Sequence, residues 1–139
     1  GSEMCIRDRQ WEIVQDIRVN GGDTKKAQSD AAVLLRENAD IKGFFGCNNT
    51  STVGIVNTLF EEERIDVVLV GFDLADETKQ MLQNPEYHAV TVLQKQDQMG
   101  YLGMLSLNSL IKGEKSEQKY FDTGVIMVDS DYLMENAVS

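Results

Sequence analysis

Short apolar runs and longer amphipathic stretches alternate along this chain. The apolar runs, rich in aliphatic and aromatic residues, predict strands over 11–17, 41–47, 65–73, 89–94 and 123–128. Apolar residues at helical spacing predict helices over 24–38, 53–60, 76–82 and 96–112, with a last turn of helix over 131–137. Such alternation indicates parallel βαβ units, so the predicted fold is α/β, with a doubly wound, mainly parallel sheet and helices on both faces.

The segment Ile65 to Asp73 predicts the central strand. Its aliphatic run indicates a strand buried on both faces, and Asp73 stands just past the carboxyl end. In open α/β sheets this edge is where ligands bind. Farther along the chain, Gly100 and Gly103 share one face of a predicted helix, and we expect that face to approach the sheet closely.

Polar residues follow three of the predicted strands: Asn48 and Asn49, Asp73, and Gln94. A carboxylate accepts hydrogen bonds from hydroxyls, and amides both donate and accept, so the set suits a polyhydroxy ligand. Other roles stay open for each residue. Asn48 or Asn49 can cap the next helix, Asp73 can cap a helix near Ala75, and Gln94 can be a solvated loop residue.

Composition and motifs exclude several function classes. A net charge of −10 opposes nucleic-acid binding, and no apolar stretch is long enough to span a membrane. The polar edge holds one carboxylate and no recognisable nucleophile and base, so we expect no enzyme. We also expect no cofactor and no metal, because no phosphate loop is present and His88 has no His or Cys at ligand spacing.

Residues 1–9 look foreign to the rest of the chain. Met4 to Arg9 resembles the translation of a transposase adapter from sequencing libraries, and the alternative is an ordinary N-terminus. On the first interpretation, residues 1–9 are non-native, the domain covers 10–139, and a leader peptide upstream would be out of view.

Four ordered motifs together resemble the type I periplasmic sugar-binding proteins of ABC importers, closest to the ribose-binding branch. They are Gly43 to Asn49 with Val53-Gly54, Val68 to Asp73, Ala89 to Gln94 with Gly100, and Asp122 to Val125. The resemblance implies that the chain is most of the C-terminal lobe of a two-lobed protein. It lacks the N-terminal lobe and the first strand-helix unit of its own lobe, and we expect self-association because a central strand is missing.

The resemblance also implies roles for individual residues. Asn48, Asp73 and Gln94 match residues that bind sugar hydroxyls, Asn49 is a further candidate, and Thr123 and Gly124 match a hinge crossing. The expected function is therefore the solute-binding component of an ABC sugar importer, at the periplasm or cell envelope of a bacterium, with membrane subunits as partners. The alternative is the effector-binding domain of a lac-repressor-family regulator, which shares the fold.

Overall fold

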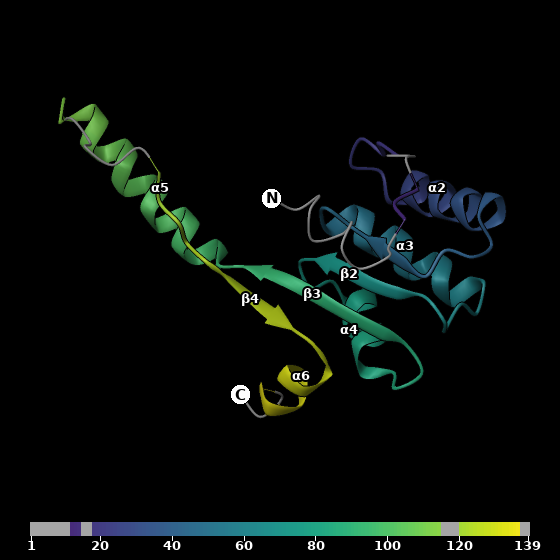
Figure 1. Cartoon of the computed structure of the whole chain (residues 1–139). Coiled ribbons are helices and arrows are strands. Elements are labelled where there is room, and N and C mark those ends of the chain that lie inside the picture. The colour runs from purple at the N-terminus through teal and green to yellow at the C-terminus, as the bar shows by residue number, and fades with distance from the viewer. Residues whose placement is uncertain (1–11, 15–17, 115–119, 137–139) are drawn as a thin grey trace.

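The computed structural model describes residues 12–14, 18–114 and 120–136 (Figure 1). Helices and strands alternate through most of this part of the chain, as the sequence predicts. In chain order the elements are α2 (Thr24–Glu37), β1 (Gly43–Phe45), α3 (Asn49–Glu61), β2 (Val68–Phe72), α4 (Asp76–Gln83), β3 (His88–Gln94), α5 (Gln96–Ile111), β4 (Val125–Val128) and α6 (Ser130–Asn136).

The four strands form one sheet in the order β1-β2-β3-β4. The first three are parallel, and β4 runs antiparallel to β3 with Val125 opposite Gln94. The predicted α/β class with a mainly parallel sheet is thus confirmed.

A further strand is predicted over 11–17. Only residues 12–14 of it are described, and they form no strand. Its other residues and the segment 1–9 lie outside the described residues.

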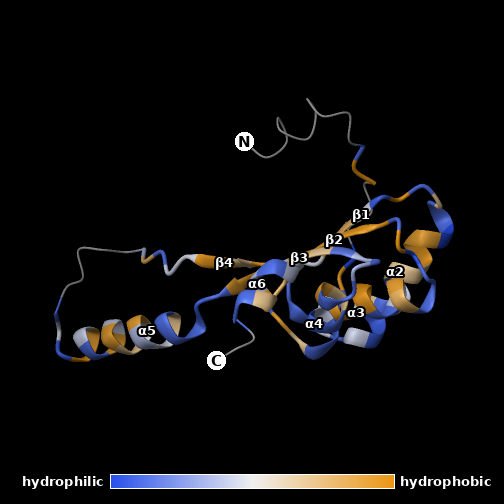
Figure 2. Ribbon diagram, turned by 90° about the horizontal axis from the view of Figure 1, so that it is seen from below, coloured by the Kyte–Doolittle hydropathy of each residue, from blue (hydrophilic) through white to orange (hydrophobic). Residues whose placement is uncertain are grey.

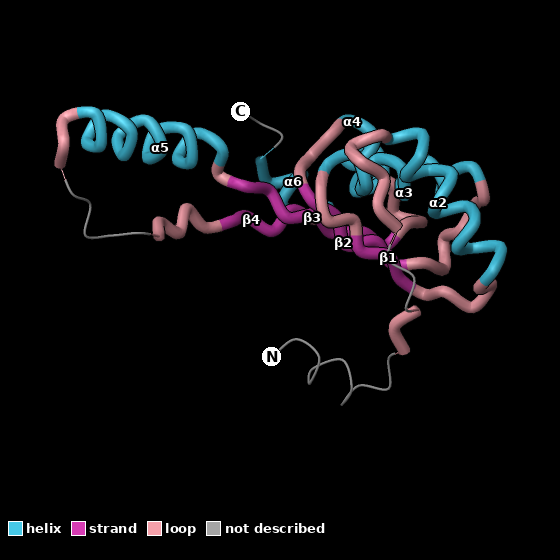
Figure 3. Tube along the Cα trace, turned by 90° about the horizontal axis from the view of Figure 1, so that it is seen from above, coloured by secondary structure: helices cyan, strands magenta, loops and turns pink. Residues whose placement is uncertain are grey.

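The core lies on one side of the sheet, where α2, α3 and α4 gather (Figure 3). Helix α2 begins at its cap Asp23, whose carboxylate accepts a 3.0 Å hydrogen bond from the Lys26 amide. Val56 and Leu59 of α3 pack with Leu69 of β2, and all three are fully buried. A second cluster joins α4, β4 and α6 through Leu82, Val128 and Leu133.

The opposite face of the sheet is largely open. The sequence predicts a central strand buried on both faces, but Leu69 is 0% exposed whereas its neighbour Val68 is 42% exposed. Alternate residues of a strand point to opposite faces, and no helix among the described residues covers the face that holds Val68. The prediction that this strand is buried on both faces is therefore wrong for β2. Other exposed apolar residues of this open sheet face are Phe45, Val125 and Met127.

Helix α5 does not pack on the sheet, which corrects the role expected for Gly100 and Gly103. A Cβ atom built at either glycine meets nothing within 4 Å, and α5 has no buried residue. The chain leaves the sheet along β3 and returns along antiparallel β4, so the helix between them lies beyond the sheet edge (Figure 1). Apolar residues of α5 such as Leu107 and Ile111 are consequently exposed. Figure 2 shows orange, hydrophobic turns along α5, which lies apart from the other helices.

Candidate functional site

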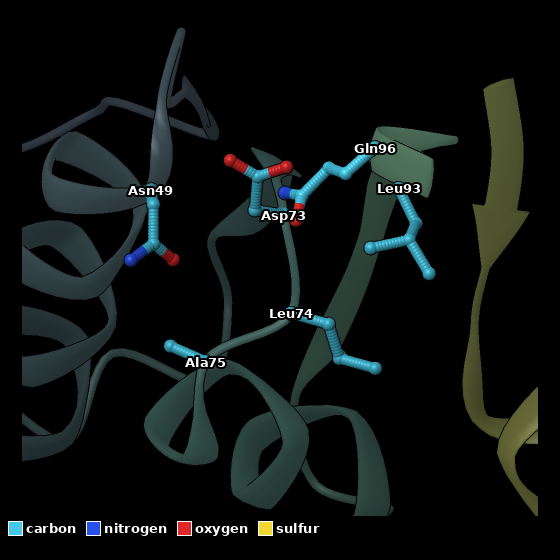
Figure 4. A pocket seen from close by; sticks show the side chains of 6 residues that line it. All are labelled: Asn49, Asp73, Leu74, Ala75, Leu93 and Gln96. Atoms are coloured by element: carbon cyan, nitrogen blue, oxygen red, sulfur yellow. The ribbon is translucent and has the colours of Figure 1, made fainter. Parts of the chain in front are cut away.

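The loops at the carboxyl ends of the parallel strands meet around an open pocket of about 290 Å³ (Figure 4). Polar side chains reach it from α3, from the loop after β2 and from the start of α5, and apolar side chains complete its wall. The lining residues are Asn49, Asp73, Leu74, Ala75, Leu93 and Gln96. The pocket thus lies at the sheet edge where the sequence predicts ligand binding.

Asp73 has an unusual backbone and an accessible carboxylate. Its φ of 64° is left-handed, a conformation that Asp tolerates better than most residues. The amide of Asp73 donates to the Val92 carbonyl at 2.9 Å, and the Thr91 hydroxyl donates to the Asp73 carbonyl at 2.7 Å. The residue that caps α4 is Ala75, which makes no side-chain cap bond, so Asp73 is not a helix cap and that alternative is wrong.

Gln94 holds the carboxylate of Asp73 in place. Its Nε2 donates a 3.1 Å hydrogen bond to Oδ1 of Asp73, from the last residue of β3. Gln94 is half-buried, so it is not the solvated loop residue that the sequence left open as an alternative. The structure therefore brings together two of the residues that the sequence groups by their position after strands.

Asn48 and Asn49 have different surroundings. Oδ1 of Asn48 accepts from the Ser51 amide at 2.8 Å and from the Thr50 hydroxyl at 2.9 Å, so Asn48 is the N-cap of α3. Asn49, the first residue of the helix, lines the pocket. The interpretation of one asparagine as a cap is confirmed. Within the described residues, the Nδ2 group of Asn48 makes no hydrogen bond, so it can still donate to a ligand.

Gln96 is a pocket residue that the sequence reasoning missed. It is the first residue of α5, and the sequence pattern predicts only a helix at this position. The sequence signal for it is its position, because Gln96 lies two residues after Gln94, just past the end of a predicted strand. In Figure 4 the Gln96 side chain extends toward Asp73 from the side of the pocket opposite Asn49. The pocket thus offers one carboxylate and two amides beside the apolar side chains of Leu74 and Leu93.

Thr123 and Gly124, the predicted hinge residues, lie directly before β4. Gly124 has a φ of 67°, and its amide donates to the Asp122 carboxylate at 2.8 Å. A Cβ atom at Gly124 would lie 3.6 Å from Nζ of Lys95, so the segments that enter and leave α5 run side by side. This arrangement is compatible with the hinge role that the sequence predicts for Thr123 and Gly124.

The described residues contain no group of three or more His, Cys, Asp or Glu side chains that could hold a metal ion. No helix among them is both long and apolar enough to cross a bilayer.

Comparison with known proteins identifies relatives of this chain. A family profile described as periplasmic binding protein domain matches residues 4–115. The ribose import binding protein RbsB of Escherichia coli is 30% identical over 87 residues, which cover 63% of this chain and 29% of that protein.

Solved structures similar to this chain are also binding proteins of sugar transporters or ABC transporters. A solute-binding protein of an ABC transporter from Agrobacterium vitis, with bound D-fucose, has a TM-score of 0.84 and 25% identity over 98% of this chain and 46% of its own. The periplasmic component of a sugar transport system from Hahella chejuensis has a TM-score of 0.70 and 27% identity over 77% of this chain and 38% of its own. The chain spans less than half of each relative, and it belongs to the periplasmic binding protein domain family.

Proposed function

We propose that this chain is the sugar-binding C-terminal lobe of the solute-binding component of an ABC-type importer. The observation that carries the proposal is the carboxylate of Asp73, which Gln94 holds at a pocket that also contains the amides of Asn49 and Gln96. A carboxylate that has already accepted one hydrogen bond keeps further lone pairs for the hydroxyls of a ligand.

The chemistry of the pocket suits a monosaccharide. Neighbouring sugar hydroxyls can donate to the free oxygen of Asp73 and exchange hydrogen bonds with the Asn49 and Gln96 amides. Asn48 does not line the pocket, but its exposed side chain directly precedes Asn49, and its Nδ2 can supply a further donor to a ligand. Leu74 and Leu93 provide apolar surface for the C–H groups of a sugar ring. The E. coli relative is a ribose import protein and the A. vitis structure contains D-fucose, which supports a sugar as the ligand class.

The pocket forms one wall of the proposed binding site. Its volume of about 290 Å³ lies at the lower limit of ligand pockets, which enclose most of a bound ligand. We infer that residues 10–139 are one of two lobes of a longer protein, that the other lobe supplies the opposite wall, and that Thr123 and Gly124 belong to the hinge. We further infer a periplasmic or cell-envelope location, with importer membrane subunits as partners.

The alternative is an effector-binding domain of a lac-repressor-family regulator. The matched relatives named above are import and transport binding proteins, which favours the importer component. The charge of −10 also disfavours a role at DNA for this segment.

The test is to recover the complete reading frame from genomic DNA and to express the encoded protein. Calorimetric titration with D-ribose, D-arabinose, D-fucose and D-tagatose should then detect at least one sugar that binds with a Kd of about 1 μM or below. The upstream sequence is a second readout, since a helix-turn-helix domain would instead identify the regulator. Failure of all four sugars and of a wider hexose and pentose panel would refute the proposal.

A further inference from the structure

Two buried threonines, Thr52 of α3 and Thr91 of β3, lie beneath the candidate pocket, and both are 0% exposed. Resting on the function proposed above, we propose that their hydroxyl groups are positioning groups that hold the binding loops in register. Neither side chain lines the pocket. Each acts through hydrogen bonds to the backbone of the loops that do.

Thr52 joins the loop after β1 to the end of β2. Its Oγ1 donates to the Asn48 carbonyl at 2.9 Å and accepts from the Phe72 amide at 2.9 Å. Asn48 is the cap of the helix that presents Asn49, and Phe72 directly precedes Asp73. One hydroxyl therefore fixes the distance between the loop that carries the asparagines and the loop that carries the carboxylate.

Thr91 supports Asp73 from the neighbouring strand. Its Oγ1 donates to the Asp73 carbonyl at 2.7 Å, at the residue whose φ of 64° is left-handed. Such a backbone conformation is unfavourable for most residues and persists only where its surroundings enforce it. The hydrogen bonds from Thr91 and to the Val92 carbonyl supply that enforcement, and they orient the side chain of Asp73 toward the pocket.

The surrounding glycines make room for these two hydroxyls. A Cβ atom at Gly46 would lie 2.6 Å from Oγ1 of Thr52. A Cβ atom at Gly71 would lie 2.5 Å from Cγ2 of Thr52 and 3.2 Å from Oγ1 of Thr91. Both threonines therefore pack against Gly71, where any larger residue would displace them.

Thr58 provides a matched control in the same helix. It is also buried, and its hydroxyl has two carbonyl acceptors for its single proton, those of Gln28 at 2.9 Å and Gly54 at 3.0 Å. These partners lie where α2 packs on α3, and neither of them lines the pocket. Replacement of Thr58 by Val thus removes a comparable hydroxyl without disturbing the binding loops.

The experiment uses the protein from the complete reading frame, titrated with D-ribose, D-arabinose, D-fucose and D-tagatose. The sugar that the parent protein binds is used for the variants. Thr52→Val and Thr91→Val should each raise its Kd by about 5- to 10-fold, which corresponds to the loss of one hydrogen bond. Thr52→Ser and Thr91→Ser, which keep the hydroxyl, should restore most of the affinity. Thr58→Val should leave the affinity unchanged even though it lowers the melting temperature.

A double-mutant cycle separates positioning from general destabilisation. Asp73→Gly removes the carboxylate and keeps a residue suited to a left-handed backbone. If Thr91 acts by positioning Asp73, Thr91→Val should cost little further affinity in the Asp73→Gly background. An equal loss of affinity in both backgrounds would overturn the positioning role.

A structural readout without sugar keeps this inference distinct from the proposed function. Amide hydrogen exchange at Asp73 should accelerate in Thr91→Val but not in Thr58→Val. If the parent protein binds no sugar, the proposed function fails, whereas parental exchange at Asp73 in Thr91→Val would by itself refute the positioning of this loop by Thr91. If the parent binds sugar while both Val variants keep parental affinity and parental exchange at Asp73, the inference alone is overturned.

Discussion

Gln94 and Asp73 form a hydrogen bond across the ends of two adjacent strands, with Nε2 of Gln94 3.1 Å from Oδ1 of Asp73. The parallel register of β2 and β3 pairs Phe72 with Val92, which brings the residues that follow within reach of each other. The carboxylate is consequently held by the strand beside it, in an orientation that the backbone of its own loop could not fix alone.

The first prediction concerns this carboxylate. In the two-lobed protein, Asp73→Gly should weaken sugar binding by about 10- to 100-fold, because a hydrogen bond to a charged group contributes about 1.5–3 kcal/mol. Glycine is chosen because the φ of 64° would strain a residue with a Cβ atom. Asp40→Gly, at an exposed carboxylate away from the pocket, is the control for loss of charge. Equal affinities for both variants, measured by calorimetry, would remove Asp73 from the site.

Sequence patterns identified the elements and the pocket edge well, because both depend on local periodicity and on where strands end. The central strand and Asp73 behind it are clear in the run from Val67 to Asp73. The roles of Asn48 and Asn49 could not be separated, since a shift of one residue decides which side chain caps α3. The position of α5 could not be predicted either, because helical periodicity does not reveal which surface a helix packs against.

Two glycines in helices should respond oppositely to alanine. A Cβ atom at Gly54 would lie 2.5 Å from Cβ of Ala27 and 2.7 Å from the Gln28 amide nitrogen, where α2 and α3 meet. Gly54→Ala should therefore reduce the free energy of unfolding by about 1–3 kcal/mol. Gly100→Ala, at a site with nothing within 4 Å, should increase it by up to about 1 kcal/mol through helix propensity.

Urea denaturation of both glycine variants would test the prediction. If Gly54→Ala were as stable as the parent, the close contact between α2 and α3 would be wrong. A large loss of stability in Gly100→Ala would instead show that α5 packs closely against another surface through this residue.

Thr78 is the site of a predicted stabilising change. Thr78 is a buried residue of α4, and its Oγ1 has no hydrogen-bond partner within the described residues. A buried polar group without a partner costs about 1–3 kcal/mol, so Thr78→Val should raise the free energy of unfolding by about 1 kcal/mol. The contrasting control is Thr58→Val, which should lower it because that hydroxyl has two acceptors. Chemical denaturation would show the two shifts in opposite directions.

The ion pairs of Asp66 should make stability depend on acid pH. Hydrogen bonds from Arg64 at 2.7 Å and from Lys42 at 2.6 Å hold the pKa of Asp66 well below its usual range. Because the pKa is lower in the folded state, the stabilisation is complete above the unfolded value of about 3.9 and is lost as pH falls from there toward the folded value. Asp66→Asn should make the stability depend less on pH in this acid range. Thermal melts in which the melting temperature of this variant falls with pH as steeply as that of the parent would contradict the prediction.

The last prediction concerns the open sheet face, where Phe45, Val68, Val125 and Met127 are exposed to solvent. Exposed apolar residues gathered on one face of a sheet favour association, so the 139-residue chain should form dimers or larger species in sedimentation velocity. Met127→Lys should reduce this association, whereas Val19→Lys, at an exposed residue outside the sheet, should not. Both changes move the net charge of −10 toward zero, which by itself would promote association. If association decreases with Met127→Lys and not with Val19→Lys, the open sheet face is the surface that associates. A parent chain that sediments as a monomer at every concentration would show that the open face does not drive self-association.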